Sequence, residues 1–240
     1  GTLEQFLNTL NTSWNFEFLG TALYPNLLAV QEFFTYAILV AVGYAFYRRL
    51  VLRPEGLGKS RDAEYILVFT GSLMLSIIMM NAFHIVALDP WYKNGFIFSR
   101  HLSDLVATLD LSSDAAHGLS VFFKWIHMTL VLGFAMYIPN SKHLHIVAAG
   151  PNTALKHIGR AKAMTPIDFT NESLTQYGAA KVTELTWKDS LDFYSCTECG
   201  RCQDLCPAWN TGKPLSPKKL IVDLKYDMFR NKESILAGKY

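Results

Sequence analysis

The sequence contains few cysteines and few charged residues. Only four of its 240 residues are cysteines, and all four lie within residues 196–206. A secreted disulfide scaffold spreads its cysteines along the chain, so this clustering argues against one and favours reduced thiolates on a metal. Charged residues make up 18% of the chain and the net charge is +2, which is too small to indicate nucleic-acid binding. The first five residues also lack the basic region of a signal peptide.

Hydrophobic residues make up half of the chain and gather in three long stretches. The predicted membrane spans cover residues 27–47, 65–88 and 118–138, each about 20 residues long, which suffices to cross a bilayer as a helix. The middle stretch contains no charged residue, a pattern that is rare in helices of soluble proteins. The first stretch contains Gln31 and Glu32, and the third contains Lys124.

The basic residues of the connecting loops predict the orientation of these spans. The loop after the first span holds five of them: Arg48, Arg49, Arg53, Lys59 and Arg61. The opposite loop, residues 89–117, holds only Lys93 and Arg100. Because loops rich in Lys and Arg stay in the cytoplasm, we expect a prokaryotic cytoplasmic membrane with the N-terminus outside and the cysteines inside. Thiols also stay reduced in the cytoplasm.

The chain therefore divides into a membrane domain at 1–149, a linker at 150–188 and a small cysteine-containing module at 189–240. Residues 95–112 are amphipathic and too polar to span, so we expect them to form a helix on the outer membrane surface, with residues 1–23 a second candidate. The predicted fold is mainly α: a transmembrane helical bundle followed by a small α-helical, ferredoxin-like iron–sulfur module. We expect that module to continue beyond Tyr240.

The cysteines follow the pattern Cys196-x-x-Cys199-x-x-Cys202-x-x-x-Cys206-Pro. One tight loop with this spacing supplies three thiolates to a [4Fe–4S] cluster, and in two-cluster proteins the fourth cysteine ligates the other cluster. Structural zinc is the alternative, but zinc sites usually use two separated Cys-x-x-Cys knuckles. If Cys206 ligates another cluster, the first cluster has only three ligands in this sequence. Its fourth ligand, or the rest of the second cluster's ligands, would come from a second motif downstream, which we favour, or from a partner. The alternative is that all four cysteines, Cys206 included, bind one cluster.

Seven histidines are present, and His84 and His127 lie inside predicted spans. Two imidazoles from different helices hold a haem b, and both residues belong to the outer half of the membrane. His145 follows His127 by eighteen residues, so it shares the same helix face if that helix continues past Pro139. We interpret the remaining histidines as surface or cofactor-edge residues: His101, His117, His143 and His157.

Two stretches resemble a known family. The stretch WIHMTLVLGFAMYIPNSKHLHI (125–146) resembles the last membrane helix of proteins with a nitrate-reductase gamma-like haem b domain. The stretch YGAAKVTELTWKDSLDFYSCTECGRCQDLCPAWNTGKPLSPKKLIVDL (177–224) resembles the first cluster motif of the same proteins. These are the membrane-bound electron-transfer-flavoprotein dehydrogenases, which are related to the heterodisulfide reductase D subunit. The resemblance covers about residues 62–230.

This resemblance implies two b haems held by histidines of two helices. His127 and His145 match one helix and His84 matches the other, but Met74 stands at its second ligand position. The resemblance therefore implies one haem between His84 and His127, and it leaves undecided whether a second haem is bound. The family also implies an electron-transfer flavoprotein as partner and quinone as substrate. Glu32 and Lys124 are candidates for the proton side of quinone chemistry.

Three functions are compatible with these features. The first is a quinone-linked oxidoreductase, or a subunit of one, that moves electrons between a cytoplasmic donor, [4Fe–4S], haem b and quinone. The second is a non-catalytic membrane anchor with structural zinc, and the third is a redox-sensing subunit.

Overall fold

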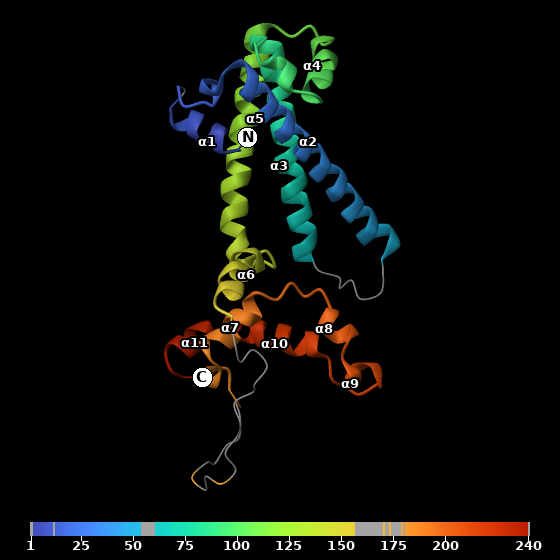
Figure 1. Ribbon diagram of the computed structural model, residues 1–240, viewed down its shortest axis with the longest axis vertical. Coiled ribbons are helices and arrows are strands. Elements are labelled where there is room, and N and C mark those ends of the chain that lie inside the picture. Colours follow the sequence, from blue (N-terminus) through green and yellow to red (C-terminus); the bar gives the residue numbers. More distant parts are fainter. Residues whose placement is uncertain are drawn as a thin grey trace. The chain divides into compact units, whose positions relative to one another are not determined.

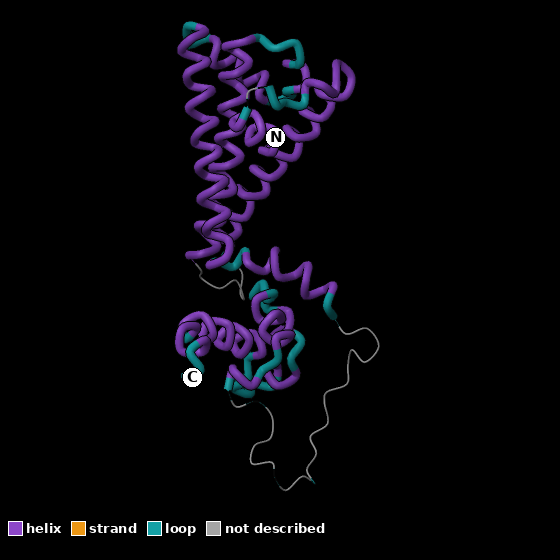
Figure 2. The backbone as a smooth tube through the Cα atoms, turned by 90° about the vertical axis from the view of Figure 1, so that its left-hand side faces the viewer, coloured by secondary structure: helices purple, strands orange, loops and turns teal. Residues whose placement is uncertain are grey.

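The computed structural model describes residues 2–11, 13–53, 61–156, 170, 173, 179 and 181–239. Within these ranges the chain forms helices and connecting loops, and no strand occurs there (Figures 1 and 2). They form two compact units, Gly1–Tyr137 and Ile138–Tyr240, which we name the membrane unit and the cysteine unit. The mainly α fold predicted from the sequence is confirmed.

Three long helices run through the membrane unit (Figure 1): α2 (Gly20–Tyr47), α3 (Arg61–Leu88) and α5 (Ser113–Tyr137). Each is long and apolar enough to cross a membrane, as the three predicted stretches indicated. A bilayer offers no partners to backbone N–H and C=O groups, so an apolar segment satisfies them within one helix. α5 begins earlier than predicted, because Asp114 in its first turn favours the positive end of the helix dipole.

Helices α3 and α5 pack against each other most extensively, as an antiparallel pair. The rings of Phe83 and Phe123 stack with centroids 5.7 Å apart, and those of Phe69 and Phe134 stack at 5.5 Å. Near the Phe83–Phe123 stack, the Ser120 hydroxyl donates a hydrogen bond of 3.1 Å to a backbone carbonyl of α3, that of Met80. These contacts fix which residues of the two helices lie at the same level.

Short helices lie beside the long ones in the membrane unit: α1 (Thr2–Leu10), a 3-10 turn (Lys93–Gly95) and α4 (Ser99–Ala107). The polar segment expected at 95–112 thus contains a shorter helix. A Cβ on Gly95 would lie 2.6 Å from the Pro25 carbonyl oxygen, so glycine permits the close approach of this connection to α2. Around this approach lies a buried core of Tyr24, Leu28, Ile85, Tyr92 and Phe96.

The third long helix ends at Tyr137. A 3-10 turn at Ile138–Asn140 follows, and a new helix, α6, begins at Leu144. Pro139 explains the break, since it has no N–H to donate and its ring collides with the carbonyl of the preceding turn. His127 and His145 therefore lie on different helices, and the continuous helix considered from the sequence is absent over these described residues.

The cysteine unit consists of short helices: α6 (Leu144–Ala154), a 3-10 turn (Val182–Glu184), α7 (Trp187–Tyr194), α8 (Arg201–Asp204), α9 (Pro207–Asn210), α10 (Pro217–Arg230) and α11 (Lys232–Leu236). α7 packs against both α6 and α10, and the rings of Tyr194 and Phe229 meet edge to face with centroids 5.3 Å apart. The hydroxyls of Thr186 and Ser216 cap α7 and α10. The module is thus helical, while its ferredoxin-like character stays a prediction.

Candidate metal centre

The four cysteines lie on one continuous segment of the cysteine unit. Cys196 follows α7, Cys202 lies in α8, and Cys206 caps the N-terminus of α9, where Pro207 occupies the first turn. All four thiols are free. Cys196 and Cys206 are half-buried, whereas Cys199 and Cys202 are exposed. The segment therefore carries four free thiols close together in the sequence, and their role as metal ligands stays a prediction.

Two residues with positive φ give the cysteine loop its shape. Gly200 has a φ of 87° and lies at the N-cap of α8. Glu198 has a φ of 58°, a conformation that non-glycine residues rarely adopt. The chain thus turns sharply on both sides of Cys199.

Backbone N–H groups of this loop point at sulfur. The N–H of Glu198 donates to Cys196 Sγ over 3.4 Å. The backbone N–H of Arg201 lowers the pKa of the Cys199 thiol, and the side chain of Thr197 adds to this effect. Because metals bind the thiolate form, these donors favour the charge state that a cluster needs.

The thiols do not converge on one point. In the described part of the chain, no three His, Cys, Asp or Glu side chains gather as they would around a single metal ion. A tetrahedral zinc site needs such convergence, with sulfurs about 2.3 Å from the metal. A [4Fe–4S] cluster binds its thiolates on separate iron corners, and four free thiols on one continuous segment are the donor type that such a cluster takes.

A set of charged side chains that the sequence did not reveal lies beside the loop. Glu198 pairs with Lys142, which precedes α6, and its other carboxylate oxygen lies 4.0 Å from the ammonium of Lys225 on α10. The position of Glu198 between two cysteines is the one signal that could have drawn attention to it. Neither Lys142 nor Lys225 has a sequence signal that links it to the cysteines.

His127 is buried in the membrane unit, with 2% of its surface exposed. Its Nδ1 lies 2.9 Å from the Ser76 hydroxyl on α3, and its Nε2 lies 3.1 Å from the Thr2 hydroxyl on α1. Both ring nitrogens thus have hydroxyl partners. Axial ligation of a haem iron would require one of these hydrogen bonds to be given up.

His84 lies at another level of the same helix pair. Its Nε2 lies 3.1 Å from the hydroxyl of Tyr92, whose pKa is raised to about 12 by burial and by nearby carboxylates, so the phenol stays protonated. His84 is eight residues beyond Ser76, the contact of His127, or about 12 Å along the helix axis. A bis-histidine haem needs both imidazoles at one level, so the described arrangement holds no ready clamp between them.

His145 belongs to the cysteine unit. Its Nδ1–H donates to the Lys142 carbonyl over 2.6 Å, which leaves Nε2 with the lone pair in the neutral ring. Metal-ligating histidines commonly have this arrangement. The ring of His143 lies edge to face with it at 6.0 Å. His101 and His117 are exposed, as expected of surface residues, and His157 lies outside the described residues.

The two candidates for the proton side of quinone chemistry take part in structural contacts. The Glu32 carboxylate accepts hydrogen bonds from the backbone N–H groups of Phe98 and Ser99, at 2.8 and 3.2 Å, where α4 begins. Lys124 donates to the Asn8 side chain over 2.6 Å, which joins α5 to α1. Both side chains therefore tie short helices to the long ones.

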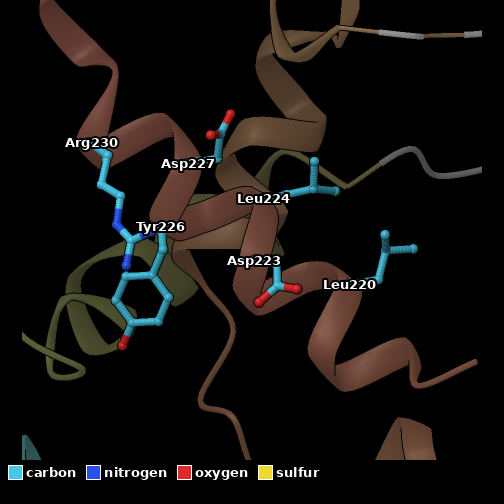
Figure 3. A pocket seen from close by; sticks show the side chains of 6 residues that line it. All are labelled: Leu220, Asp223, Leu224, Tyr226, Asp227 and Arg230. Carbon is cyan, nitrogen blue, oxygen red and sulfur yellow. The ribbon is translucent and has the colours of Figure 1, made fainter.

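A pocket on the cysteine unit lies on α10 (Figure 3). It is lined by Leu220, Asp223, Leu224, Tyr226, Asp227 and Arg230. None of these lining residues is a cysteine or a histidine, so the pocket does not belong to the candidate metal centre.

Comparison with known proteins gives relatives by sequence. No protein-family model matches the chain, and no solved structure matches it. The chain is 38% identical over 205 residues to "Probable iron-sulfur-binding oxidoreductase FadF" of Bacillus subtilis, a match that covers 84% of this chain and 28% of the relative. It is 34% identical over 116 residues to "EtfAB:quinone oxidoreductase" of Syntrophomonas wolfei, over 48% of this chain and 16% of the relative.

A third relative is "Probable membrane-anchored ferredoxin" of Chromohalobacter salexigens, 35% identical over 80 residues, which are 33% of this chain and 12% of the relative. The chain thus spans less than a third of the length of each of these relatives. Two of these relatives are named oxidoreductases, one of them iron–sulfur-binding, and the third is named a membrane-anchored ferredoxin. Together with the cysteine loop and the three apolar helices, these homologues support an iron–sulfur oxidoreductase family for this chain.

Proposed function

We propose that this chain is the membrane-bound, electron-carrying part of an oxidoreductase that links a soluble donor to quinone. The loop of four free cysteines, with backbone donors directed at two of its sulfurs, is the observation that carries the proposal. An electron-transfer flavoprotein is the donor that the sequence resemblance implies. A relative named EtfAB:quinone oxidoreductase supports both this donor and quinone as the acceptor.

In this proposal the cysteines hold a [4Fe–4S] cluster, which when bound stores and releases one electron. Cys196, Cys199 and Cys202 bind three iron corners, and Cys206 ligates the fourth corner or another cluster. The backbone donors of the loop stabilise the thiolates. The chain covers 28% of the Bacillus relative, so a second cysteine motif elsewhere in the full protein is part of the proposal.

The three apolar helices hold this site at a membrane surface. We place the cysteine unit on the cytoplasmic side, because Arg48, Arg49, Arg53 and Arg61 gather in and beside one loop of the membrane unit. There the thiols stay reduced and a soluble donor reaches them.

A haem b is a separate part of the proposal. Its support is the resemblance, which assigns His84, His127 and His145 as ligands, together with the burial of His127 and the free Nε2 lone pair of His145. For a haem iron to bind between His84 and His127, each ring would have to give up a hydrogen bond to a hydroxyl group. The two rings would also have to move to the same position along the axes of α3 and α5.

Metal analysis and spectroscopy of the purified full chain test the main proposal. We expect iron and labile sulfide, a reduced [4Fe–4S] signal in electron paramagnetic resonance (EPR), and oxidation of the reduced protein by a water-soluble quinone. Zinc without iron would identify a structural anchor and contradict the proposal. A cluster that quinone does not oxidise would identify a sensor.

The haem has its own test in His127→Ala, with His101→Ala, an exposed residue of α4, as the matched control. We expect the b-type absorption spectrum to disappear in His127→Ala and to persist in the control, with the cluster signal unchanged in both. An intact haem spectrum in His127→Ala would reject this ligand. The absence of haem from the native protein would leave the iron–sulfur proposal standing.

A further inference from the structure

Glu198 occupies a backbone position that suits glycine better. It lies between Cys196 and Cys199 with a φ of 58°, where a side chain is strained. Such a conformation at a candidate site suggests that the side chain itself has a role. Gly200, two residues later, shows that the same loop uses glycine at its other left-handed position.

The side chain of Glu198 is directed into the protein, with 10% of its surface exposed. One oxygen pairs with the ammonium of Lys142. The other lies 4.0 Å from the ammonium of Lys225, whose side chain is 4% exposed. Among the described residues, no hydrogen-bond donor reaches that second oxygen.

Two positive charges and one negative charge thus lie against the cysteine loop. Burial strengthens their field, because little water screens it. The carboxylate anchors the residue whose backbone N–H donates to Cys196 Sγ. Net charge, hydrogen bonds to sulfur and solvent exposure are the properties by which a protein sets the potential of a bound cluster.

We propose that Glu198 is a positioning residue of the cysteine site, which together with Lys142 and Lys225 sets the reduction potential of the metal group held there. The inference rests on the proposed iron–sulfur function. Removing the carboxylate takes one negative charge away from beside the cysteine loop, which favours the more negative, reduced state of the metal group. Removing the charge of Lys142 or Lys225 disfavours the reduced state of the metal group.

Potentiometric titration of the full membrane protein, followed by EPR, measures this effect. We expect Glu198→Gln to raise the potential, and Lys142→Met and Lys225→Met to lower it. Each change should alter the equilibrium constant for one-electron reduction at least about threefold, which is about 28 mV at 59 mV per tenfold change. Native-like potentials in all three variants would overturn the inference.

Glu198→Gly separates charge from backbone shape. Glycine favours the left-handed conformation, so the loop keeps its turn while the carboxylate is lost. We expect its potential to rise as in Glu198→Gln; an unchanged potential in Glu198→Gly would mean that the residue has only a conformational role. The control is Lys219→Met, which removes an exposed ion pair with Asp223 on α10 and should leave the potential unchanged.

Iron and sulfide content distinguish the two proposals. A native protein without iron and sulfide would contradict the proposed function. A native protein with a cluster, and variants that titrate as it does, would contradict only the role of Glu198. If Glu198→Gln does not assemble a cluster, the two lysine variants provide the same test with the opposite sign.

Discussion

In the membrane unit, the buried carboxylates of Glu4 and Glu32 accept hydrogen bonds from neutral groups, whereas in the cysteine unit Glu198 faces two ammonium groups. Glu4 accepts from the Tyr24 hydroxyl at 2.7 Å, and Glu32 accepts from backbone N–H groups at the start of α4. Glu198 has Lys142 and Lys225 beside it. Buried charge thus fastens short helices in one unit and surrounds sulfur ligands in the other.

This difference reflects the groups that each unit must stabilise. A membrane offers no water to backbone groups that a short helix leaves unpaired, so a carboxylate that accepts two N–H bonds stabilises the start of α4. The cysteine loop instead carries four thiols, and N–H donors and nearby cations are the groups that stabilise a thiol in its thiolate form. The position of a buried glutamate alone does not tell which of these roles it has.

Loss of a cysteine should have the largest effect, and it should affect the cysteine unit but not the membrane unit. We expect Cys199→Ala to abolish the [4Fe–4S] signal and to lower the iron content of the purified protein, because one iron corner loses its thiolate. Membrane insertion should be unchanged, since α2, α3 and α5 do not depend on the cysteines. EPR and fractionation of membranes measure the two outcomes, and a cluster that survives in Cys199→Ala would exclude this residue as a ligand.

The carboxylate that caps α4 should have the next largest effect. We expect Glu32→Ala to lower the free energy of unfolding of the detergent-solubilised protein by about 3 kcal/mol, because two buried N–H groups lose a charged acceptor. Glu32→Gln keeps one acceptor oxygen and should lose about 1 kcal/mol. Equal losses in both variants would show that the hydrogen bonds to α4 are not what stabilises the unit. The cluster signal should stay native in both.

A smaller effect is expected where α2 meets the turn before α4. Gly95→Ala would place a methyl group 2.6 Å from the Pro25 carbonyl oxygen, so the two segments must separate. We expect a loss of about 2 kcal/mol in the free energy of unfolding, within the range for overpacked sites. Gly118→Ala on α5 is the matched control, because no atom lies within 4 Å of its added Cβ. A loss in the control as large as that in Gly95→Ala would refute the close approach as the cause.

Much of the fold could be predicted from the sequence, because membrane helices depend on local composition. An uncharged run such as 65–88 must satisfy its backbone internally and becomes α3. Whether the third helix continues past Pro139 to His145 was harder to predict, since a proline is compatible with a bent helix as well as a broken one. Whether the helix bends or breaks at such a proline depends on the tertiary packing of the residues on its C-terminal side.

The candidate metal centre was predicted only in part. The spacing of the four cysteines predicts that one loop supplies them, and the structure places them on one continuous segment, while metal binding by them stays a prediction. The charges around that loop come from far away in the sequence: Lys142 is 56 residues from Glu198. Likewise, the histidine pair proposed from burial in the spans lies at two levels of α3 and α5, which only the packing of these helices shows.

The sequence by itself determined the three apolar helices and the four-cysteine loop, because both depend on neighbours along the chain: an apolar run long enough for a bilayer and a ligand spacing short enough for one turn. Only the tertiary structure decided which polar side chains meet. Glu32 meets α4, His127 meets Ser76 and Thr2, and Glu198 meets two lysines, because these contacts form when separate helices pack against one another.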